Sequence, residues 1–252
     1  MTSNKVAVVT AAAGAGIGAA IAKRLAADGF DVVITDAHAR RAEQLATELT
    51  DQHDREFMWS HLDVTDPAAV SDTMDRVAAE RGGLHVLVNN AGWSKIEPVA
   101  EMELETWRRC LDVDLNGTFY CMRYALPHII SSGGGAVVNI SSIAGWEMTT
   151  EHGAAYSAAK AGVMALTRVA AAENGRHGVR VNAVAPGLIY NEFLTRIYPP
   201  EFFSGYVDNR SMVGRVGVPE DVAALVSFLV GPEAGYITGE VYGVSGGVHP
   251  HA

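Results

Sequence analysis

The stretch KVAVVTAAAGAGIGAAIAKRLAADG, residues 5–29, decides the fold predicted for this chain. It begins with a run of Val and Ala without polar alternation, which is typical of a strand buried on both faces of a sheet. A turn rich in Ala and Gly follows, and after it a longer segment with helix-forming residues. The stretch therefore predicts a buried strand, a tight turn and a helix, in that order.

The same alternation repeats along the rest of the chain. Further strands are predicted at DVVITD, EFMWSHLDV, LHVLVNN, AVVNISS, VRVNAVAPG and EVYGVSGG, with helical segments between most of them. Strands that are separated by helices pair in parallel, because a crossover must bring the chain back to the same end of the sheet. We therefore expect a doubly wound α/β fold, with one parallel sheet of about seven strands and helices on both faces.

Length and composition favour one compact soluble domain over residues 1–252. Of these residues 48% are hydrophobic and 8% aromatic, and no repeat or flexible linker divides the sequence. A formal charge of −10 argues against a nucleic-acid partner. No apolar run is long enough for a membrane helix, and the first strand begins too early to leave room for a signal peptide. These features predict a cytoplasmic protein that acts on a small molecule, without a membrane partner.

The two cysteines predict no special chemistry. Cys110 and Cys121 fall in one helical stretch, with no CxxC motif and no Cys/His cluster nearby. We expect two buried thiols, and neither a disulfide nor a metal site.

The ends of the first two strands predict a dinucleotide site. In sheets of this kind ligands bind outside the carboxyl ends of the strands. The turn TAAAGAGIG, residues 10–18, lets the backbone approach a pyrophosphate, and the helix after it offers N–H groups and a positive dipole end. Asp36, 18 residues after Gly18, can bind the adenosine ribose hydroxyls and repel a 2′-phosphate. NAD(H) is therefore the expected cofactor, and Arg40 and Arg41 keep NADP(H) as the alternative.

A tyrosine and a lysine stand four positions apart in HGAAYSAAKAG, residues 152–162. On a helix this spacing places Tyr156 and Lys160 on one face, so the phenol and the ammonium can point into the same space. Taken alone, the pair is also compatible with an ordinary helix surface.

Four features in order resemble the short-chain dehydrogenase/reductase family: the glycine-rich turn, Asn-Asn-Ala-Gly at residues 89–92, Ser142, and the Tyr156/Lys160 pair. The resemblance covers essentially the whole chain. It implies a Rossmann-like fold, an NAD(P)(H)-dependent oxidoreductase that interconverts a hydroxyl and a carbonyl, and a homotetramer. The nearly all-apolar helix around Tyr156 also favours a second subunit packed against it.

The resemblance implies roles for the three residues of the proton chemistry. Tyr156 is the general acid/base, and Lys160 stabilises its phenolate and binds the nicotinamide ribose. Ser142 holds the substrate oxygen, since the family places the active serine second in the pair that begins at Ser141. The remaining cofactor contacts implied are Thr10, Gly14, Gly16, Ile17, Gly18, Asp63, Val64, Asn90, Ala91, Gly92, Pro186, Gly187 and Ile189.

The sequence departs from the family pattern at three positions. Ala11 stands where the first glycine of the turn is usual, and the turn is one residue longer than usual. Asp114 replaces an Asn that holds a water in the proton relay, so the relay is expected to differ; Asn116 could take over only if its helix deforms. Asn191 stands where a Thr often binds the nicotinamide carboxamide, and an amide can both donate and accept.

Residues 188–212 are predicted to form a lid over the substrate. The segment is rich in aromatic and aliphatic residues, and Arg196 and Arg210 within it could meet the phosphates of a coenzyme A thioester. An apolar lid favours a bulky alicyclic, steroid-like or acyl-thioester substrate, although the aromatic side chains could instead pack against another subunit. The expected substrate pocket contains Trp93, Ser142, Trp146, Met148, Leu188, Asn191 and Leu194.

Three functional hypotheses follow. The first is an NAD(H)-dependent secondary alcohol dehydrogenase or ketone reductase that uses Tyr156 as its acid/base. The second is an NADPH-dependent 3-oxoacyl thioester reductase, against which Asp36 argues. The third is a non-catalytic NAD sensor, against which the presence of Ser142, Tyr156 and Lys160 argues.

Overall fold

In the computed structural model, β1 (Val6–Val9) lies beside β4 (Val86–Asn89) in a seven-stranded sheet of order β3-β2-β1-β4-β5-β6-β7. Every pair of neighbouring strands is parallel. The structure describes residues 5–147, 152–191, 194–196 and 198–250. It confirms the doubly wound α/β fold that the sequence predicts.

The remaining elements follow the predicted alternation. The other strands are β2 (Asp31–Asp36), β3 (Trp59–His61), β5 (Gly135–Ile140), β6 (Val179–Pro186) and β7 (Val241–Val244). The helices are α1 (Ile17–Ala27), α2 (Ala39–His53), α3 (Pro67–Arg81), α4 (Leu104–Leu111), α5 (Gly117–Ser131), α6 (Ala154–Asn174), α7 (Pro200–Asn209) and α8 (Pro219–Val230). None of the helices in the described ranges is long and apolar enough to cross a membrane.

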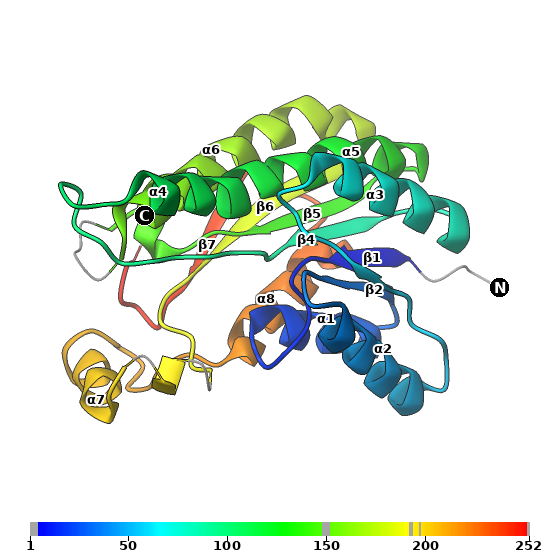
Figure 1. Cartoon of the computed structure of the whole chain (residues 1–252). Coiled ribbons are helices and arrows are strands. Elements are labelled where there is room, and N and C mark those ends of the chain that lie inside the picture. Colours follow the sequence, from blue (N-terminus) through cyan, green and yellow to red (C-terminus); the bar gives the residue numbers. More distant parts are fainter. Residues whose placement is uncertain (1–4, 148–151, 192–193, 197, 251–252) are drawn as a thin grey trace.

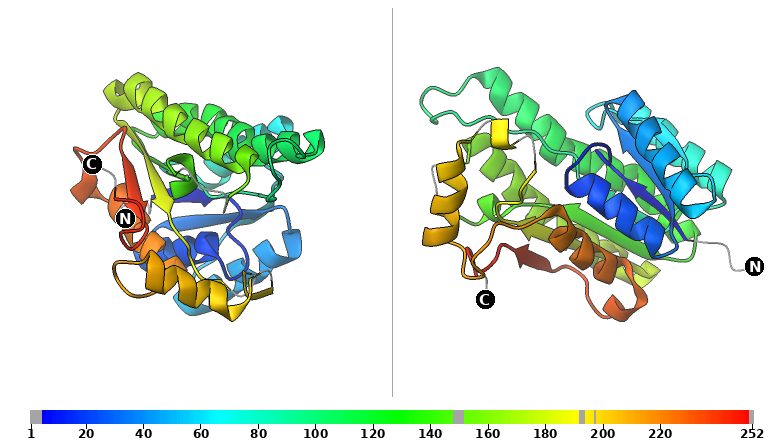
Figure 2. Two further views of the ribbon diagram at one scale, coloured as in Figure 1. Left: turned by 90° about the vertical axis from the view of Figure 1, so that its left-hand side faces the viewer. Right: turned by 90° about the horizontal axis from the view of Figure 1, so that it is seen from below.

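Two layers of helices cover the sheet (Figure 1 and Figure 2). One face carries α3, α4, α5 and α6, and the opposite face carries α1, α2 and α8. Successive side chains of β1 serve both layers: Val6 and Val8 belong to one hydrophobic core, Ala7 and Val9 to the other. Burial on both sides explains why the strands lack polar alternation.

The direction of winding reverses between β1 and β4. From β1 the chain continues outward to β2 and β3, whereas from β4 it continues the other way through β5, β6 and β7. Crossovers that start at these two strands therefore leave toward opposite faces, and a crevice opens outside their carboxyl ends. The polar strand ends noted in the sequence meet at this crevice.

The predicted helical stretch that contains Cys110 and Cys121 changes its winding in the middle. Between α4 and α5 the chain makes a π-helical turn at Asp112–Asn116. Such turns insert an extra residue into a helix and occur frequently at functional sites. Within this turn Asp114 is buried and Asp112 is exposed. The helix thus deforms where the sequence analysis considered a deformation.

The segment predicted as a lid is an excursion closed at its base. Gly217 N donates to Leu188 O at 3.1 Å, and Tyr190 N donates to Gly217 O at 2.7 Å. Between these points lie a short 3-10 helix at Leu194–Arg196 and α7. In Figure 1, α7 lies apart from both helical layers, on the side of the sheet's carboxyl edge. Its function as a lid stays a prediction.

Replacing Ala11 by Gly is expected to stabilise the fold. Ala11 has a φ of 47°, in the left-handed region where a Cβ costs energy. Removing that Cβ relieves strain in the folded state. Glycine also gives the unfolded chain more conformational freedom, but this effect is smaller, so the free energy of unfolding should rise by about 1 kcal/mol. Chemical denaturation would measure the change. Ala13→Gly is the control, because Ala13 is not among the residues with a positive φ, and this change should lower stability. A similar loss of stability in Ala11→Gly would contradict the expectation.

Candidate active site

A pocket of about 590 Å³ opens at the carboxyl edge of the sheet. Its lining includes Ser142, which follows β5, and Tyr156 and Lys160, which stand one helical turn apart near the start of α6. The structure therefore brings together the three side chains on which the predicted proton chemistry depends. Their roles stay predictions.

Lys160 is buried to 3% exposure and is held by three neighbours. Its Nζ lies 3.0 Å from Asp114 Oδ1, donates to Ile140 O at 3.0 Å and lies 5.4 Å from the centre of the Tyr156 ring. Burial works to lower the pKa of Lys160, but the negative charge of Asp114 overcomes it, and the net shift is upward. Lys160 therefore stays protonated beside Tyr156.

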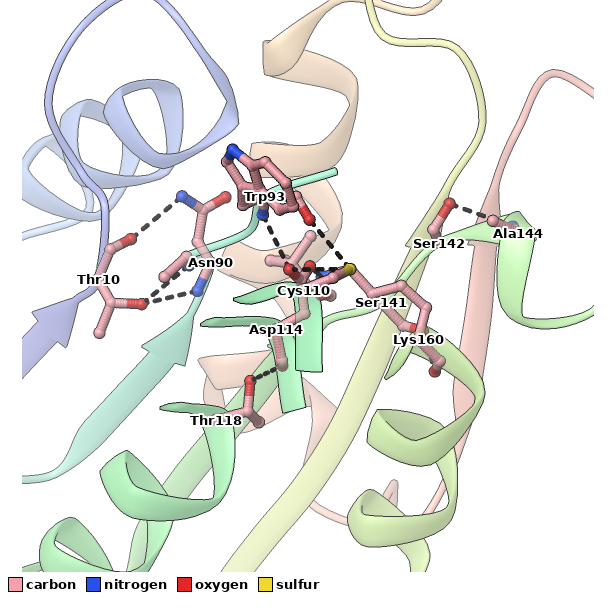
Figure 3. Close-up of polar contacts among 12 residues, drawn as sticks. Thr10, Asn90, Trp93, Cys110, Asp114, Thr118, Ser141, Ser142, Ala144 and Lys160 are labelled. Atoms are coloured by element: carbon pink, nitrogen blue, oxygen red, sulfur yellow. Dashed lines mark hydrogen bonds and ion pairs between the residues drawn. The ribbon is translucent and has the colours of Figure 1, made fainter. Parts of the chain in front are cut away.

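Asp114 is fully buried, with its two carboxylate oxygens directed to different partners (Figure 3). Oδ1 faces Lys160, and Oδ2 accepts the backbone N–H of Trp93 at 2.8 Å. The Thr118 hydroxyl donates to the Asp114 backbone carbonyl at 2.8 Å, within the irregular turn. Asn116 instead donates to Asp112 at 2.8 Å. The deformed helix thus turns Asp114, and not Asn116, toward the lysine.

Burial raises the pKa of the Tyr156 phenol above its ordinary value. The positive charge of Lys160 and a hydrogen bond with Ser142 lower it, and the negative charge of Asp114 raises it. The net shift is upward. Without a further positive charge, Tyr156 is therefore a phenol, ready to donate a proton to a carbonyl oxygen.

The two serines after β5 have different surroundings, although both line the pocket. The Ser141 hydroxyl donates to Lys160 O at 2.9 Å and so ties the strand end to α6. The Ser142 hydroxyl accepts the N–H of Ala144 at 3.1 Å, which fixes the oxygen while its own hydrogen can still be donated. This arrangement suits Ser142 for holding a substrate oxygen.

The glycine-rich turn packs closely against the end of β4. A Cβ built at Gly18 would lie 2.3 Å from Ala11 O and 2.5 Å from Asn90 Nδ2, so only glycine fits there. Asn90 Nδ2 donates to Thr10 O at 3.1 Å and to Ala11 O at 3.0 Å, which fixes the shape of the turn. Among the described residues no side chain caps the start of α1, where Gly16 is the N-cap. The N–H groups at the start of α1 are therefore available to bind a phosphate.

Thr10 is buried at the start of the glycine-rich turn. Its side chain is 1% exposed, and its hydroxyl accepts N–H groups from Asn90 at 2.9 Å and from Ala91 at 3.1 Å. Because it is enclosed between β1 and β4, the Thr10 side chain positions the turn, and its predicted contact with a cofactor stays a prediction.

A second pocket, of about 450 Å³, lies at the end of β2. Asp36 is fixed there by two backbone N–H groups, from Ala13 to Oδ2 at 3.1 Å and from His38 to Oδ1 at 2.8 Å. Each oxygen has a second lone pair for a ligand hydroxyl. Asp63, Val64 and Ala91 also line this pocket. The set matches an adenosine site.

The two pockets form one groove. Ala11, Gly92 and Trp93 line both of them, and the Arg109 guanidinium lies 4.5 Å from the centre of the Trp93 ring. One end of the groove holds Asp36 and the other end holds Tyr156. An extended dinucleotide fits this arrangement, with its phosphates at the glycine-rich turn between the two ends.

On the substrate side, most of the predicted residues line the larger pocket. Trp93, Leu188, Asn191 and Leu194 do so, as do the predicted cofactor contacts Ile17, Pro186, Gly187 and Ile189. Trp146 lies outside this lining, with its ring centre 5.6 Å from that of His249, and its predicted place in the substrate pocket stays a prediction. The short turn after Ser142 directs it toward the C-terminal segment. Met148 falls outside the described residues.

Four lining residues were missed by the sequence analysis: Ser94, Ile140, Ile143 and His152. Ser94 and Ile143 follow recognised strand ends directly, so their position next to Trp93 and Ser142 was the available signal. His152 has no motif; its ring lies 6.2 Å from the Tyr156 ring because the chain enters α6 there.

Cys110 and Cys121 are buried, as the sequence predicts. Both are free thiols, and burial raises the pKa of each to about 12. Neither is therefore a thiolate at neutral pH. Within the ranges that the structure describes, no three His, Cys, Asp or Glu side chains gather in a way that could hold a metal ion.

Known proteins resemble this chain over nearly its whole length. The sequence model of the family described as Enoyl-(Acyl carrier protein) reductase matches residues 11–249. The (5R,7aS)-5-hydroxy-7a-methyl-1-oxo-2,3,5,6,7,7a-hexahydro-1H-indene-carboxyl-CoA reductase of Mycobacterium tuberculosis is 42% identical over 247 residues, covering 97% of this chain and 93% of the relative. The cis-4-hydroxycyclohexanecarboxylate dehydrogenase of Sinomonas cyclohexanicum is 42% identical over 246 residues, covering 97% and 96%.

A solved structure shows the same similarity in three dimensions. The L-sorbose reductase of Gluconobacter frateurii, determined with NADPH and L-sorbose, superposes with a TM-score of 0.92 at 28% identity, covering 99% of this chain and 98% of that one. The relatives are named as dehydrogenases and reductases. They confirm the predicted enzyme class, an oxidoreductase that acts on a hydroxyl group or the corresponding carbonyl.

Replacing Asp114 by Asn is expected to move the pH dependence of alcohol oxidation to lower pH. The Asp114 charge raises the pKa of Tyr156, so its removal lowers that pKa, and the phenolate that accepts the alcohol proton forms at lower pH. The measurement is kcat/KM for oxidation as a function of pH. Asp112→Asn removes an exposed carboxylate from the same turn and should leave the profile in place. A profile that Asp114→Asn does not move would contradict this coupling.

Proposed function

The chain belongs to the short-chain dehydrogenase/reductase family, and on this premise we propose that it is an NAD(H)-dependent enzyme that interconverts a ring-borne secondary alcohol and its ketone. The observation that carries the proposal is the shared groove: Asp36 stands at one end of it, and Ser142, Tyr156 and Lys160 stand together at the other. A nicotinamide cofactor belongs to the chemistry of the family, and the preference for NAD(H) is part of the proposal.

The substrate class is proposed from the pocket and from the names of the relatives. Ile143, Leu188, Tyr198 and Phe202 give the larger pocket an apolar wall, which suits an alicyclic or steroid-like body. Tyr198 and Phe202 stack against each other, with their ring centres 4.2 Å apart. The two relatives described above are named for ring compounds that carry a carboxyl group or a carboxyl-CoA group. A ring-bearing acid or its thioester is therefore the favoured substrate.

In the proposed mechanism the residues of the pocket hold the reacting oxygen and move its proton. Ser142 donates a hydrogen bond to the substrate oxygen, which lies next to the Tyr156 phenol. Tyr156 gives its proton to that oxygen in reduction and takes it back in oxidation. When bound, the nicotinamide supplies or accepts the hydride at the neighbouring carbon.

Lys160 and Asp114 set the charge around this proton transfer. Lys160 lies within reach of the Tyr156 ring and has a third N–H for the cofactor ribose, beyond those directed to Asp114 and Ile140. The Asp114 carboxylate balances the lysine, so the phenol keeps its proton until a further positive charge arrives. This balance suits proton donation to a ketone at neutral pH.

The choice between cofactors follows from Asp36. Its carboxylate, held in place by Ala13 and His38, suits two ribose hydroxyls and opposes a 2′-phosphate. An NADPH-dependent 3-oxoacyl thioester reductase is the second candidate, and relative affinity for NADH and NADPH separates the two. The non-catalytic sensor remains as a third, because a sensor needs Asp36 but no proton donor.

A homotetramer stays part of the proposal. Leu104 and Trp107 on α4, Phe119 on α5 and Val169 on α6 are exposed apolar side chains on the same helical layer. Side chains of this kind suit a contact with a second copy. The cytoplasmic location and the lack of a nucleic-acid or membrane partner also stay predictions.

A substrate panel tests the proposed function. NADH consumption would be followed with alicyclic ketones, steroid ketones and 3-oxoacyl thioesters, with NADPH in parallel. Turnover of ring ketones with NADH supports the proposal. Turnover of linear 3-oxoacyl thioesters with NADPH would favour the second candidate, and tight NADH binding without any turnover would favour the sensor.

Tyr156→Phe should abolish turnover and preserve NADH binding. The change removes one hydroxyl and keeps the ring beside Lys160, so kcat should fall by at least about 100-fold while the affinity for NADH changes little. Steady-state kinetics and NADH fluorescence titration measure the two effects. Full activity in this variant would remove Tyr156 from the role of acid/base.

Asp36→Ser should shift cofactor preference toward NADPH. Serine keeps a hydrogen-bonding oxygen but removes the charge that opposes a 2′-phosphate, so the ratio of kcat/KM for NADH over NADPH should fall by roughly 10- to 100-fold. Asp63→Ser, at a neighbouring residue of the same pocket, is the control and should change this ratio much less. An unchanged ratio in Asp36→Ser would locate cofactor selection elsewhere.

A further inference from the structure

Among the described residues, three lysine or arginine side chains line the two pockets of the groove, and the proposed mechanism gives Arg109 no role. Lys160 and Arg210 line the larger pocket, and Arg109 lines the smaller one. Lys160 is paired with Asp114, and Arg210 is paired with Glu147. Arg109 is paired with no carboxylate in the part of the chain that the structure describes. Its charge and its N–H donors are therefore available to a ligand.

Arg109 lies near the place where the two pockets meet. Its guanidinium lies over the ring of Trp93, 4.5 Å from the ring centre, and Trp93 lines both pockets. Ala11, from the glycine-rich turn, also lines both. A dinucleotide that extends from Asp36 to Tyr156 must pass this junction with its pyrophosphate, because the pyrophosphate joins its two halves.

The position of Trp93 is fixed by the helical segment that carries Arg109. The Trp93 backbone N–H donates to Asp114 Oδ2 at 2.8 Å, and the Trp93 carbonyl accepts the Cys110 thiol at 3.3 Å (Figure 3). Cys110 follows Arg109 directly in α4, and Asp114 lies in the π-helical turn after it. The same stretch of chain therefore sets the positions of Trp93 and Arg109 relative to each other.

The smaller pocket otherwise opposes an anion. Arg109 is the only lysine or arginine that lines it within the described ranges, whereas four carboxylates do: Asp36, Asp63, Glu105 and Asp112. The whole chain carries a formal charge of −10. Both phosphates of a pyrophosphate are negative at neutral pH, so the long-range field of the protein resists their approach. An arginine without a carboxylate partner at the junction of the pockets offsets this repulsion locally.

We propose that the Arg109 guanidinium binds the pyrophosphate of the cofactor from the side of α4, while the N–H groups at the start of α1 bind it from the glycine-rich turn. Arginine suits this task because its planar fork meets two phosphate oxygens at once. The proposal rests on the proposed function, in which the groove binds NAD(H), and deepens it by naming a further binding residue. NADH and NADPH both contain the pyrophosphate, so Arg109 serves both, whereas Asp36 separates them.

The test measures binding of cofactor fragments and does not depend on turnover. Displacement of NADH, followed by its fluorescence, would give the affinities of adenosine, ADP and ADP-ribose. Arg109→Met should lower the affinities for ADP and ADP-ribose by roughly 5- to 50-fold and leave that for adenosine within about twofold. Arg109→Lys should keep part of the affinity, because an ammonium keeps the charge without the fork.

Arg108→Met is the matched control. Arg108 is the neighbouring exposed arginine of α4 and lines neither pocket, so its removal changes the charge of the chain equally. This variant should bind all three fragments as the wild type does. A loss of ADP affinity in Arg108→Met as large as that in Arg109→Met would reduce the effect to net charge and overturn the proposal.

Salt dependence gives a second readout, which a purely structural contact between Arg109 and Trp93 would not change. Between about 50 mM and about 500 mM NaCl, the affinity for ADP-ribose should fall more steeply in the wild type than in Arg109→Met, because salt screens the attraction between guanidinium and phosphate. Equal salt dependence in the two proteins would overturn the proposal.

Three further results would overturn it. The first is an unchanged affinity for ADP-ribose in Arg109→Met. The second is an equal loss for adenosine and ADP-ribose, which would place the arginine against the adenosine or make it a structural support for Trp93. The third is a loss confined to NADPH, which would assign Arg109 to a 2′-phosphate.

Turnover of the ring ketones separates this inference from the proposed function. Reduction of these ketones by Arg109→Met, with wild-type affinity for NADH, leaves the function standing and removes the role of Arg109. Binding of NADH that depends on Arg109, without reduction of any ketone by the wild type, supports the pyrophosphate contact and overturns the function.

Discussion

Burial of a parallel sheet on both faces is the constraint on which the rest of this structure depends. Within the strands a polar side chain is costly because helices cover each face, and those present, such as Asn139 and Asn182, are hydrogen-bonded. Polar side chains therefore collect where the strands end. Asp36, Asn90 and Ser142 are all strand-end residues, and the reversal of winding between β1 and β4 opens a crevice at that edge. The site is a consequence of how the sheet is covered.

The buried pair of Lys160 and Asp114 is the feature that distinguishes this chain within that architecture. Two charges with almost no exposure are stable only because they face each other and have further hydrogen bonds, to Ile140 O for the ammonium and from Trp93 N for the carboxylate. The π-helical turn supplies the orientation, since a regular helix would turn the residues of Asp112–Asn116 differently. The Asp114 carboxylate thus links the local helix geometry to the charge of Lys160 and to the pKa of Tyr156.

The pocket therefore has two charged ends of different character. At the inner end the charges of Lys160 and Asp114 cancel, which leaves the phenol and the serine to handle a neutral carbonyl oxygen. At the outer end Arg210 is paired with Glu147, and the wall between the ends is aromatic and aliphatic. A ligand with an apolar body and a polar oxygen at its inner end would complement this distribution.

The sequence by itself determined the order and type of the main elements, the glycine-rich turn, and the identity of the family, because these depend on local periodicity and on short motifs within a few residues. It also indicated that Asp114 would alter the relay. Only the tertiary structure decided that the helix deforms to turn Asp114 onto Lys160 and that Thr10 is enclosed. It also decided that the Trp146 ring stacks on His249 and that His152 lines the pocket. These contacts are between residues that lie far apart in the chain, so no local sequence pattern predicts them. They depend on how the packed layers bring loops and helices together.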